Sequence, residues 1–221
     1  MIVSQALQKR KSVRAYLDKA VTKEQIETIL NLAKCAPSGV NTQPWQVAVV
    51  TGKSKKILET KLLEAFENGA DKDMDYQYYP LEWKAPYTKR RVACGLQLYQ
   101  AVDIKKEDKE KRLKQWAANY RSFDAPVMLF FYMDDVMQAG SFLDFGMFLQ
   151  SIMIASTAEG LATCAQGALA EHSTIVKETL DIPKDTILLC GMALGYEDTD
   201  APINAYRTPR LDLEEFVSFH D

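Results

Sequence analysis

The sequence lacks the residue patterns of several common functional sites. Its two histidines, His172 and His220, lie neither beside a plausible nucleophile nor in a metal-ligand pattern. The four cysteines are far apart and form no CxxC pair, so neither a zinc knuckle nor a redox dithiol is expected. We therefore predict no metal site, no dedicated catalytic side chain, structural or surface histidines, and reduced, mostly buried thiols at Cys35, Cys94, Cys164 and Cys190.

The sequence also has little net charge and no long uninterrupted apolar run. A net charge of -3 gives no field that attracts nucleic acid. The N-terminal MIVSQALQKRKS becomes polar too soon for a signal peptide. The most apolar stretch, 142–162, is interrupted by Asp144, Gln150 and Glu159, whereas a membrane span needs about 20 mostly apolar residues. We expect a cytoplasmic protein with neither a nucleic-acid nor a membrane partner.

The length and the hydrophobic pattern predict a single α+β domain over residues 1–221. A chain of this length buries about 70 % of its unfolded surface, so one core is sufficient. Helices outnumber strands and do not alternate with them strictly, which disfavours a doubly wound parallel sheet. Strands are expected at 47–50, after Pro126, and at 187–194. Helices are expected from the Thr22–Gln25 capping box to Pro37, after a cap at Ser54, at 90–102, 107–121 and 142–157, and from Ser173.

Three segments have a distinct composition. Residues 142–157 are apolar nearly all round, which predicts a helix enclosed by protein on every side. Residues 68–89, rich in Asp, Tyr and Pro, are an irregular excursion and a candidate lid. Residues 202–221 form a polar C-terminal arm. Candidates for an aromatic wall that stacks on a planar ligand are Phe66, Tyr76, Tyr78, Tyr79, Trp83 and Phe123, although core packing is the better interpretation for any single one.

The first motif that can carry chemistry is the basic segment 10–14. In an extended backbone, residues two apart point to the same side, so Arg10, Ser12 and Arg14 would face one target, with Lys11 between them. Two guanidinium groups and a hydroxyl suit a phosphate and the carbonyl edge of a planar ring. Taken alone, such a cluster is more often a solvated face.

The second motif is the segment 37–45, PSGVNTQPW. Pro37 and Pro44 fix the path of the chain, and Gly39 lets the backbone approach a ligand closely. Ser38, Asn41 and Gln43 supply both donors and acceptors, which match the alternating edge of a flavin. A surface loop with self-bonded polar side chains is the alternative.

Two further motifs occur late in the chain. At 160–167 the apolar helix gives way to small residues that end in Gln166 and Gly167, where backbone N–H groups can reach a ring nitrogen. Arg207 and Arg210 form a second cationic site that can hold a phosphate together with Arg10, or that is simply solvated. No GxGxxG opens a helix after a strand, so a Rossmann nicotinamide site is not expected.

These motifs in this order resemble the oxygen-insensitive nitroreductase family over nearly the whole chain. The resemblance rests on RxSxR, PSGxNxQPW, the Gly-Leu segment before Gln-Gly, GMALGY and the Arg-rich tail. TKRRVACGLQLYQ and SFLDFGMFLQ are most similar to the nitrobenzoate-reductase-like branch. Many members have Glu before the glycine, so Gln166 is a departure that bears on the local polarity.

The resemblance implies a homodimer with FMN at the interface, a central mostly antiparallel sheet flanked by helices, and exchanged C-terminal arms. Arg10 with Arg207 or Arg210 would hold the FMN phosphate, and Ser12 and Arg14 would lie nearer the ring. Pro37, Ser38, Asn41 and Gln43 would line the flavin from the same or the other subunit. The backbone at Gln166 and Gly167 would lie near N5.

The implied activity is transfer of hydride from a transient NADH or NADPH, through FMN, to a nitroaromatic or quinone acceptor in ping-pong fashion. In that case the flavin carries the chemistry and the protein supplies position, charge and a dry environment. Two alternatives stay open. One is specialised flavin chemistry, such as reductive dehalogenation or flavin breakdown. The other is a protein that stores or senses flavin without turnover.

Overall fold

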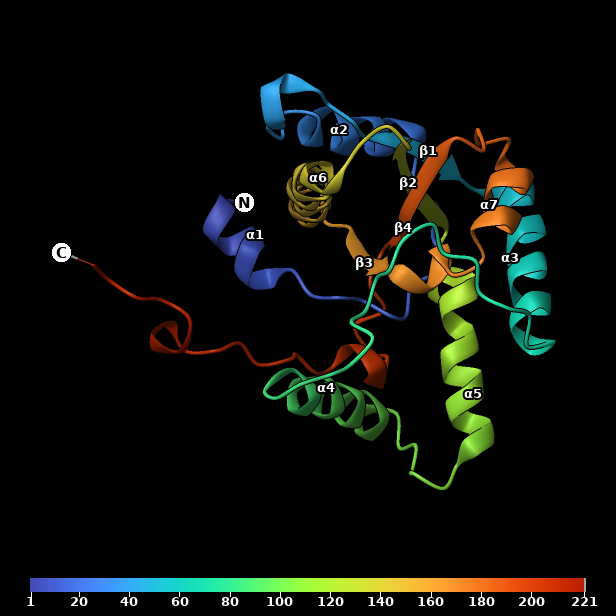
Figure 1. Cartoon of the computed structure of the whole chain (residues 1–221). Coiled ribbons are helices and arrows are strands. Elements are labelled where there is room, and N and C mark those ends of the chain that lie inside the picture. Colours follow the sequence, from blue (N-terminus) through green and yellow to red (C-terminus); the bar gives the residue numbers. More distant parts are fainter. Residues whose placement is uncertain (221) are drawn as a thin grey trace.

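The computed structural model describes residues 1–220, which form one layered α+β unit around a four-stranded sheet (Figure 1). The strands lie in the order β1-β2-β4-β3, and every neighbouring pair is antiparallel. This confirms the predicted fold class. The strand bounds are β1 (Gln46–Val50), β2 (Val127–Asp134), β3 (Ala162–Gln166) and β4 (Thr186–Gly195).

Helices cover both faces of this sheet. Figure 1 shows α1, α2 and α6 on one side, and α3 and α7 on the other. The helices are α1 (Val3–Lys9), α2 (Lys23–Ala33), α3 (Gly52–Glu67), α4 (Tyr87–Ala101), α5 (Lys109–Ala117), α6 (Ala139–Ala158) and α7 (Ser173–Leu180). Short 3₁₀ turns are η1 (Gly39–Asn41), η2 (Ala118–Asp124), η3 (Gly167–Ala170), η4 (Pro202–Asn204) and η5 (Leu213–Glu215).

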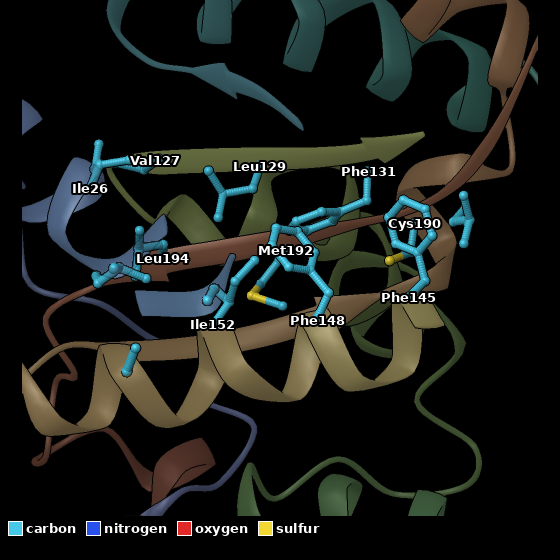
Figure 2. Close-up of a cluster of buried hydrophobic side chains, with 14 of the residues drawn as sticks. Ile26, Val127, Leu129, Phe131, Phe145, Phe148, Ile152, Cys190, Met192 and Leu194 are labelled. Atoms are coloured by element: carbon cyan, nitrogen blue, oxygen red, sulfur yellow. The ribbon is translucent and has the colours of Figure 1, made fainter. Parts of the chain in front are cut away.

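Strand β2 explains why the core has two layers. Successive side chains of a strand point to opposite faces. Leu129 and Phe131 accordingly face the cluster formed with α2 and α6, whereas Met128 and Phe130 face the cluster formed with α3 and α7. Figure 2 shows the first of these clusters, between α6 and the sheet. A strand buried on both faces has to be apolar throughout, which is why the VMLFFY run is continuous rather than alternating.

Two glycines of the GMALGY motif in β4 permit close packing of neighbouring segments. A Cβ on Gly191 would lie 2.4 Å from Cδ1 of Leu169, so only glycine lets η3 pack directly against β4. A Cβ on Gly195 would lie 2.6 Å from Cδ of Pro126 and 2.9 Å from Cδ1 of Tyr16. The two glycines therefore have a structural role, because they let the neighbouring segments pack closely against β4.

Several predicted element boundaries need correction. The Thr22–Gln25 capping box is confirmed, with Oγ1 of Thr22 accepting from the Gln25 N–H. The predicted cap at Ser54 is wrong, because α3 begins at Gly52 and Ser54 lies in its first turn. Helix α4 begins at Tyr87 rather than at residue 90, and α5 ends at Ala117, after which η2 follows. Helix α1 was not predicted.

Helix α6 is not enclosed on every side, contrary to the expectation for residues 142–157. Phe145, Phe148 and Ile152 are buried against the sheet, but Leu143 on the opposite face is 71 % exposed. The helix is long and apolar enough to cross a membrane by length and composition, with only 39 % of that window buried. The packing of its inner face on the sheet accounts for its apolar residues there.

The cysteines are less buried than expected. Cys164 and Cys190 are buried, and burial raises the pKa of the Cys190 thiol to about 12. Cys35 and Cys94 are exposed, so the prediction of mostly buried thiols is wrong for half of them. His172 is 3 % exposed and lies against Tyr120, as expected for a structural histidine.

Candidate functional site

The basic segment 10–14 runs extended along the outer edge of β3. Ser12 forms a parallel bridge with Thr163, and the Val13 N–H donates to the Thr163 carbonyl at 3.0 Å. Val13 is buried, whereas Arg10, Ser12 and Arg14 line a cavity of about 740 Å³ on the other side. We call this the arginine cavity. The structure thus brings together the three side chains that the alternation predicts.

Lys11 borders the same cavity but directs its ammonium group elsewhere. Its Nζ forms an ion pair with Glu197 at 2.7 Å and donates to the Asn204 carbonyl. The side chain therefore joins the basic segment to the turn after β4. Its predicted role in cofactor binding stays a prediction, and the observed contacts are structural.

Asn204 in η4 brings the C-terminal arm to the basic segment. Its side chain is 2 % exposed. The carbonyl oxygen accepts from the Arg14 N–H at 2.8 Å, and the amide nitrogen donates to the carbonyls of Ala15 and Asp198 at 2.9 and 2.8 Å. A residue 190 positions away in sequence thereby becomes a neighbour of Arg14. Sequence reasoning missed Asn204 because nothing in its local pattern marks it.

The arm then returns Arg207 and Arg210 to the arginine cavity, which Arg10 also lines. Arg207 donates to the carbonyls of Lys9 and Arg10, and Arg210 donates to carbonyls in its own loop. Other residues at this cavity that sequence reasoning did not single out are Leu7, Gln8, Cys94, Gln150, Tyr206 and Thr208.

The arginine cavity carries uncompensated positive charge. None of the ion pairs found within residues 1–220 involves Arg10, Arg207 or Arg210. Burial, together with the like charges of Arg210 and Arg207, lowers the pKa of Arg10. Guanidinium groups that repel one another gain from an anion between them, and a phosphate accepts their paired hydrogen bonds. The cavity is therefore suited to a phosphate.

A second cavity, of about 380 Å³, lies beside the end of β3, and we call it the β3 cavity. Arg14 lines both cavities. Cys164, Gln166 and Gly167 border the β3 cavity. A Cβ on Gly167 would lie 3.2 Å from Cε2 of Tyr78, so glycine allows this ring to cover the backbone there.

The aromatic candidates divide between this cavity and the core. Tyr78, Tyr79 and Phe123 line the β3 cavity. Phe66 packs tilted on Tyr120 at 4.9 Å and belongs to the core. The two remaining candidates support the wall rather than line it: the Tyr76 hydroxyl donates to the Leu189 carbonyl, and Trp83 contacts the Tyr79 ring at 5.6 Å.

The excursion 68–89 is fixed at one end and exposed beyond it. Asp75 pairs with the buried Lys177 at 2.8 Å and also accepts from the Leu188 N–H and the Ser173 hydroxyl. Tyr79 is 58 % exposed and Leu81 is 88 % exposed. Its role as a lid stays a prediction. Arg91 lines the β3 cavity with its guanidinium 5.0 Å from the Trp83 ring, whereas Arg90 lies over Tyr87.

The loop 37–45 does not meet these cavities within one chain. Its Gly39 N–H donates to Oδ1 of Asp144 in α6, and the Gln43 N–H donates to Oγ of Ser38. Val40, Asn41 and Gln43 adopt positive φ angles of 44, 59 and 47°, so the loop has a strained, defined shape. Pro37, Gly39, Asn41 and Gln43 are exposed and line neither the arginine cavity nor the β3 cavity.

The chain thus has the features of a class of proteins that bind a phosphorylated, planar ligand: an antiparallel sheet with a basic cavity at its edge and an aromatic cavity that shares the lining residue Arg14. The Nitroreductase family model matches residues 7–196. The chain is 34 % identical to a nitrobenzene nitroreductase of Ectopseudomonas oleovorans, covering 98 % of this chain and 96 % of that one. The chain therefore belongs to the nitroreductase family.

Two further comparisons agree with this assignment. The chain is 34 % identical to a 4-nitrobenzoate reductase of Pseudomonas putida, over 95 % of this chain and 92 % of that one. The crystal structure of the FMN and NADPH-dependent nitroreductase NfnB from Sphingopyxis sp. strain HMH superimposes with a TM-score of 0.96. That structure is 36 % identical and covers 100 % of both chains.

Proposed function

We propose that this chain is an FMN-dependent nitroreductase that uses NADH or NADPH to reduce nitroaromatic acceptors. The arginine cavity carries this proposal, because it combines unpaired guanidinium groups with an extended segment at the edge of the sheet. Its volume of about 740 Å³ lies in the range of cofactor sites. The relatives named above reduce nitrobenzene and 4-nitrobenzoate, and the similar crystal structure depends on FMN and NADPH.

The residues present fit FMN. Arg10, Arg207 and Arg210 would hold the phosphate, since no carboxylate among residues 1–220 forms an ion pair with them. The ring would extend past Arg14, which lines both cavities, toward the backbone of Gly167. A guanidinium at that place favours negative charge on the ligand beside it.

When bound, FMN supplies a group that accepts hydride from a reduced nicotinamide and then passes two electrons to the acceptor. The side chains of this chain bind, orient and shield that exchange. Tyr78 and Phe123 offer aromatic faces on which a planar acceptor stacks. Both reactants would use one site in turn, which gives ping-pong kinetics.

The visible spectrum of the purified protein and a turnover assay test this function. We expect yellow protein that releases FMN on denaturation, and oxidation of NADPH that depends on added nitrobenzene or 4-nitrobenzoate. Colourless protein that does not take up added FMN contradicts the proposal. Bound FMN without turnover on nitroaromatic or quinone acceptors favours flavin storage instead.

We propose further that the working unit is a homodimer in which each site takes its loop 37–45 from the second copy. Support comes from apolar side chains left uncovered in one chain, with Val40 97 % and Leu143 71 % exposed. The C-terminal arm projects away from the body in Figure 1 and carries Phe216 and Phe219, which are 65 and 85 % exposed. Surfaces of this kind mark interfaces.

Mixed dimers distinguish a shared site from a site within one chain. Arg10→Ala chains are combined with chains that carry Asn41→Ala and Gln43→Ala. If the loop comes from the second copy, one of the two sites in each mixed dimer is intact, and half of the FMN binding returns. If both parts come from one chain, each site has a defect and no binding is recovered.

The arm makes a separate prediction. Truncation before Pro202 removes Asn204, Arg207 and Arg210, so we expect weaker FMN retention. If the arm also wraps the partner, dimerisation weakens too. Light scattering and flavin absorbance of the gel-filtration peak measure both effects. A stable, flavin-loaded dimer without the arm contradicts both roles.

A further inference from the structure

Gln166 uses only half of its side-chain amide. It is the last residue of β3 and is 4 % exposed. Its Nε2 donates to the backbone carbonyl of Asn119 in η2 at 2.9 Å, and the side-chain oxygen of Asn119 lies 3.4 Å away. Its Oε1 is buried and has no hydrogen-bond partner among the described residues. The Gln166 side chain therefore acts as a hydrogen-bond donor, to the backbone carbonyl of Asn119.

A second contact joins the start of η2 to the far end of η3. Tyr120 follows Asn119 in η2, and Glu171 follows η3. The Tyr120 hydroxyl, on a fully buried residue, donates to the Glu171 carboxylate. Burial, then the contact with Glu171, raises the pKa of Tyr120, so its hydroxyl keeps its proton. Turn η3, which begins with Gly167, is thus held between two hydrogen bonds to η2.

Turn η2 gives these hydrogen bonds a fixed support. Ser122, Phe123 and Asp124 adopt φ angles of 49, 55 and 61° in succession. Left-handed conformations at non-glycine residues cost energy and persist only where the surroundings enforce them. Ser122 is 0 % and Phe123 5 % exposed, so the core enforces this shape. The Asn119 carbonyl consequently has a defined position toward which Gln166 donates.

We infer that Gln166 is a positioning residue: its neutral amide donates to the Asn119 carbonyl and so fixes the backbone of Gly167 at the β3 cavity. This rests on the proposed function in placing the flavin ring at that backbone. A carboxylate at position 166 has no proton to donate and would face a carbonyl oxygen in a buried place. It could replace the amide only in its protonated form.

A Gln166→Glu variant tests the need for a donor through its pH dependence. The thermal unfolding midpoint of FMN-free protein is measured from about pH 5 to about pH 9. Glutamate has a pKa of about 4.3 when unfolded, and burial with a donor role raises its pKa when folded. The stabilising hydrogen bond is then present at low pH and is lost as the pH rises through the folded pKa. We expect the deficit relative to wild type to grow with pH.

Two control variants separate this effect from packing and from charge. Gln166→Met keeps the volume without a donor, so we expect a deficit that does not change with pH. Gln100→Glu adds the same charge at an exposed position of α4, so we expect no pH-dependent deficit. If Gln166→Glu does not accumulate at neutral pH, refolding at about pH 5 should recover it, because the protonated carboxyl then donates.

The second measurement concerns the loaded enzyme. The residues proposed to bind the phosphate lie in the arginine cavity, away from Gln166. Gln166→Met should therefore change FMN affinity less than about threefold. Misplacement of Gly167 should lower the rate constant of flavin reduction by NADPH about tenfold, since positioning errors act on the rate. A reduction rate equal to that of wild type would show that Gln166 only fills space, and would overturn the inference.

The two experiments distinguish failure of this inference from failure of the proposed function. If wild-type protein binds no FMN, the function is wrong, yet the pH profile of the FMN-free protein still decides whether Gln166 acts as a donor. If Gln166→Glu matches wild type at every pH, or Gln166→Met matches it in stability, the donor is not needed. Either result contradicts the positioning role whatever the cofactor.

Discussion

The inner and outer faces of α6 behave differently. On the inner face, Phe148 is 2 % exposed, stacks on Trp45 at 4.7 Å and lies edge-on to Phe131 at 6.3 Å. On the outer face of the same helix, the apolar side chain of Leu143 is 71 % exposed. The chain itself covers the inner face, whereas the Leu143 side chain on the outer face is left largely uncovered within residues 1–220.

The same contrast applies to the site. The arginine cavity is assembled within one chain from segments nearly 200 positions apart, held by Asn204 and Arg207. The loop 37–45, which resembles a flavin-binding loop just as strongly, lies elsewhere on the surface. The arginine cavity is therefore completed within one chain, whereas the loop 37–45 is where we propose that the second copy contributes.

The largest expected effect separates the two faces of α6. Phe148→Ala removes a buried ring and should lower the free energy of unfolding by about 3–5 kcal/mol. Leu143→Ala should change the stability of the single chain by less than about 0.5 kcal/mol, because an exposed side chain loses little on truncation. Urea unfolding at low protein concentration measures both.

For dimer formation we expect the opposite order, with the larger effect from Leu143→Ala. If the proposed dimer covers this face, Leu143→Ala should raise the dimer dissociation constant about tenfold, because it removes apolar surface that association takes out of water. Sedimentation equilibrium measures this constant. The contrast between the faces is lost if Leu143→Ala destabilises the monomer as strongly as Phe148→Ala. It is also lost if dimerisation is indifferent to Leu143.

The next effect concerns the part of the site that one chain completes. Arg10→Ala should weaken FMN binding by about 1.5–3 kcal/mol, or about ten- to a hundredfold, the scale of one charge-assisted hydrogen bond. Arg112 is a matched control, because it donates to the Lys106 carbonyl and lines neither cavity. Fluorescence titration with FMN measures both, and equal affinities for wild type and Arg10→Ala would remove Arg10 from the site.

The smallest effect lies in local structure. Thr22→Ala removes a confirmed helix cap and should lower stability by about 1 kcal/mol. Ser54→Ala should change stability by less than about 0.5 kcal/mol, since Ser54 lies inside α3 rather than at its cap. Thermal unfolding of the two variants decides whether the corrected start of α3 holds in solution.

Local patterns predicted the helices and strands wherever local chemistry decides them. The Thr22 capping box, the strand after Pro126 and the helix from Ser173 follow from side chains close in sequence. The start of α3 and the end of α5 were missed. Gly52 begins α3 with a φ of 54°, which glycine permits without any cap at Ser54, and after α5 the chain continues into the 3₁₀ turn η2 with no local break in the pattern.

Many residues of the candidate site could be named from the sequence, but their arrangement in space could be predicted only in part. The alternation of Arg10, Ser12 and Arg14 was sufficient to place them on one side, because period-two geometry is local. Asn204, Asp144 and Asn119 were missed as supports, since each acts on a segment distant in sequence. Their importance depends on partners that only folding brings near.

By itself the sequence determined the α+β class, the order of the motifs and the side chains of residues 10–14 that lie on one side, because periodicity is a property of short segments. Only the tertiary structure decided that Arg207 meets Arg10, that the loop 37–45 stays apart, and that Gln166 points its amide at η2. The physical reason is that these contacts join segments far apart in the chain, and their geometry is set by how the layers pack.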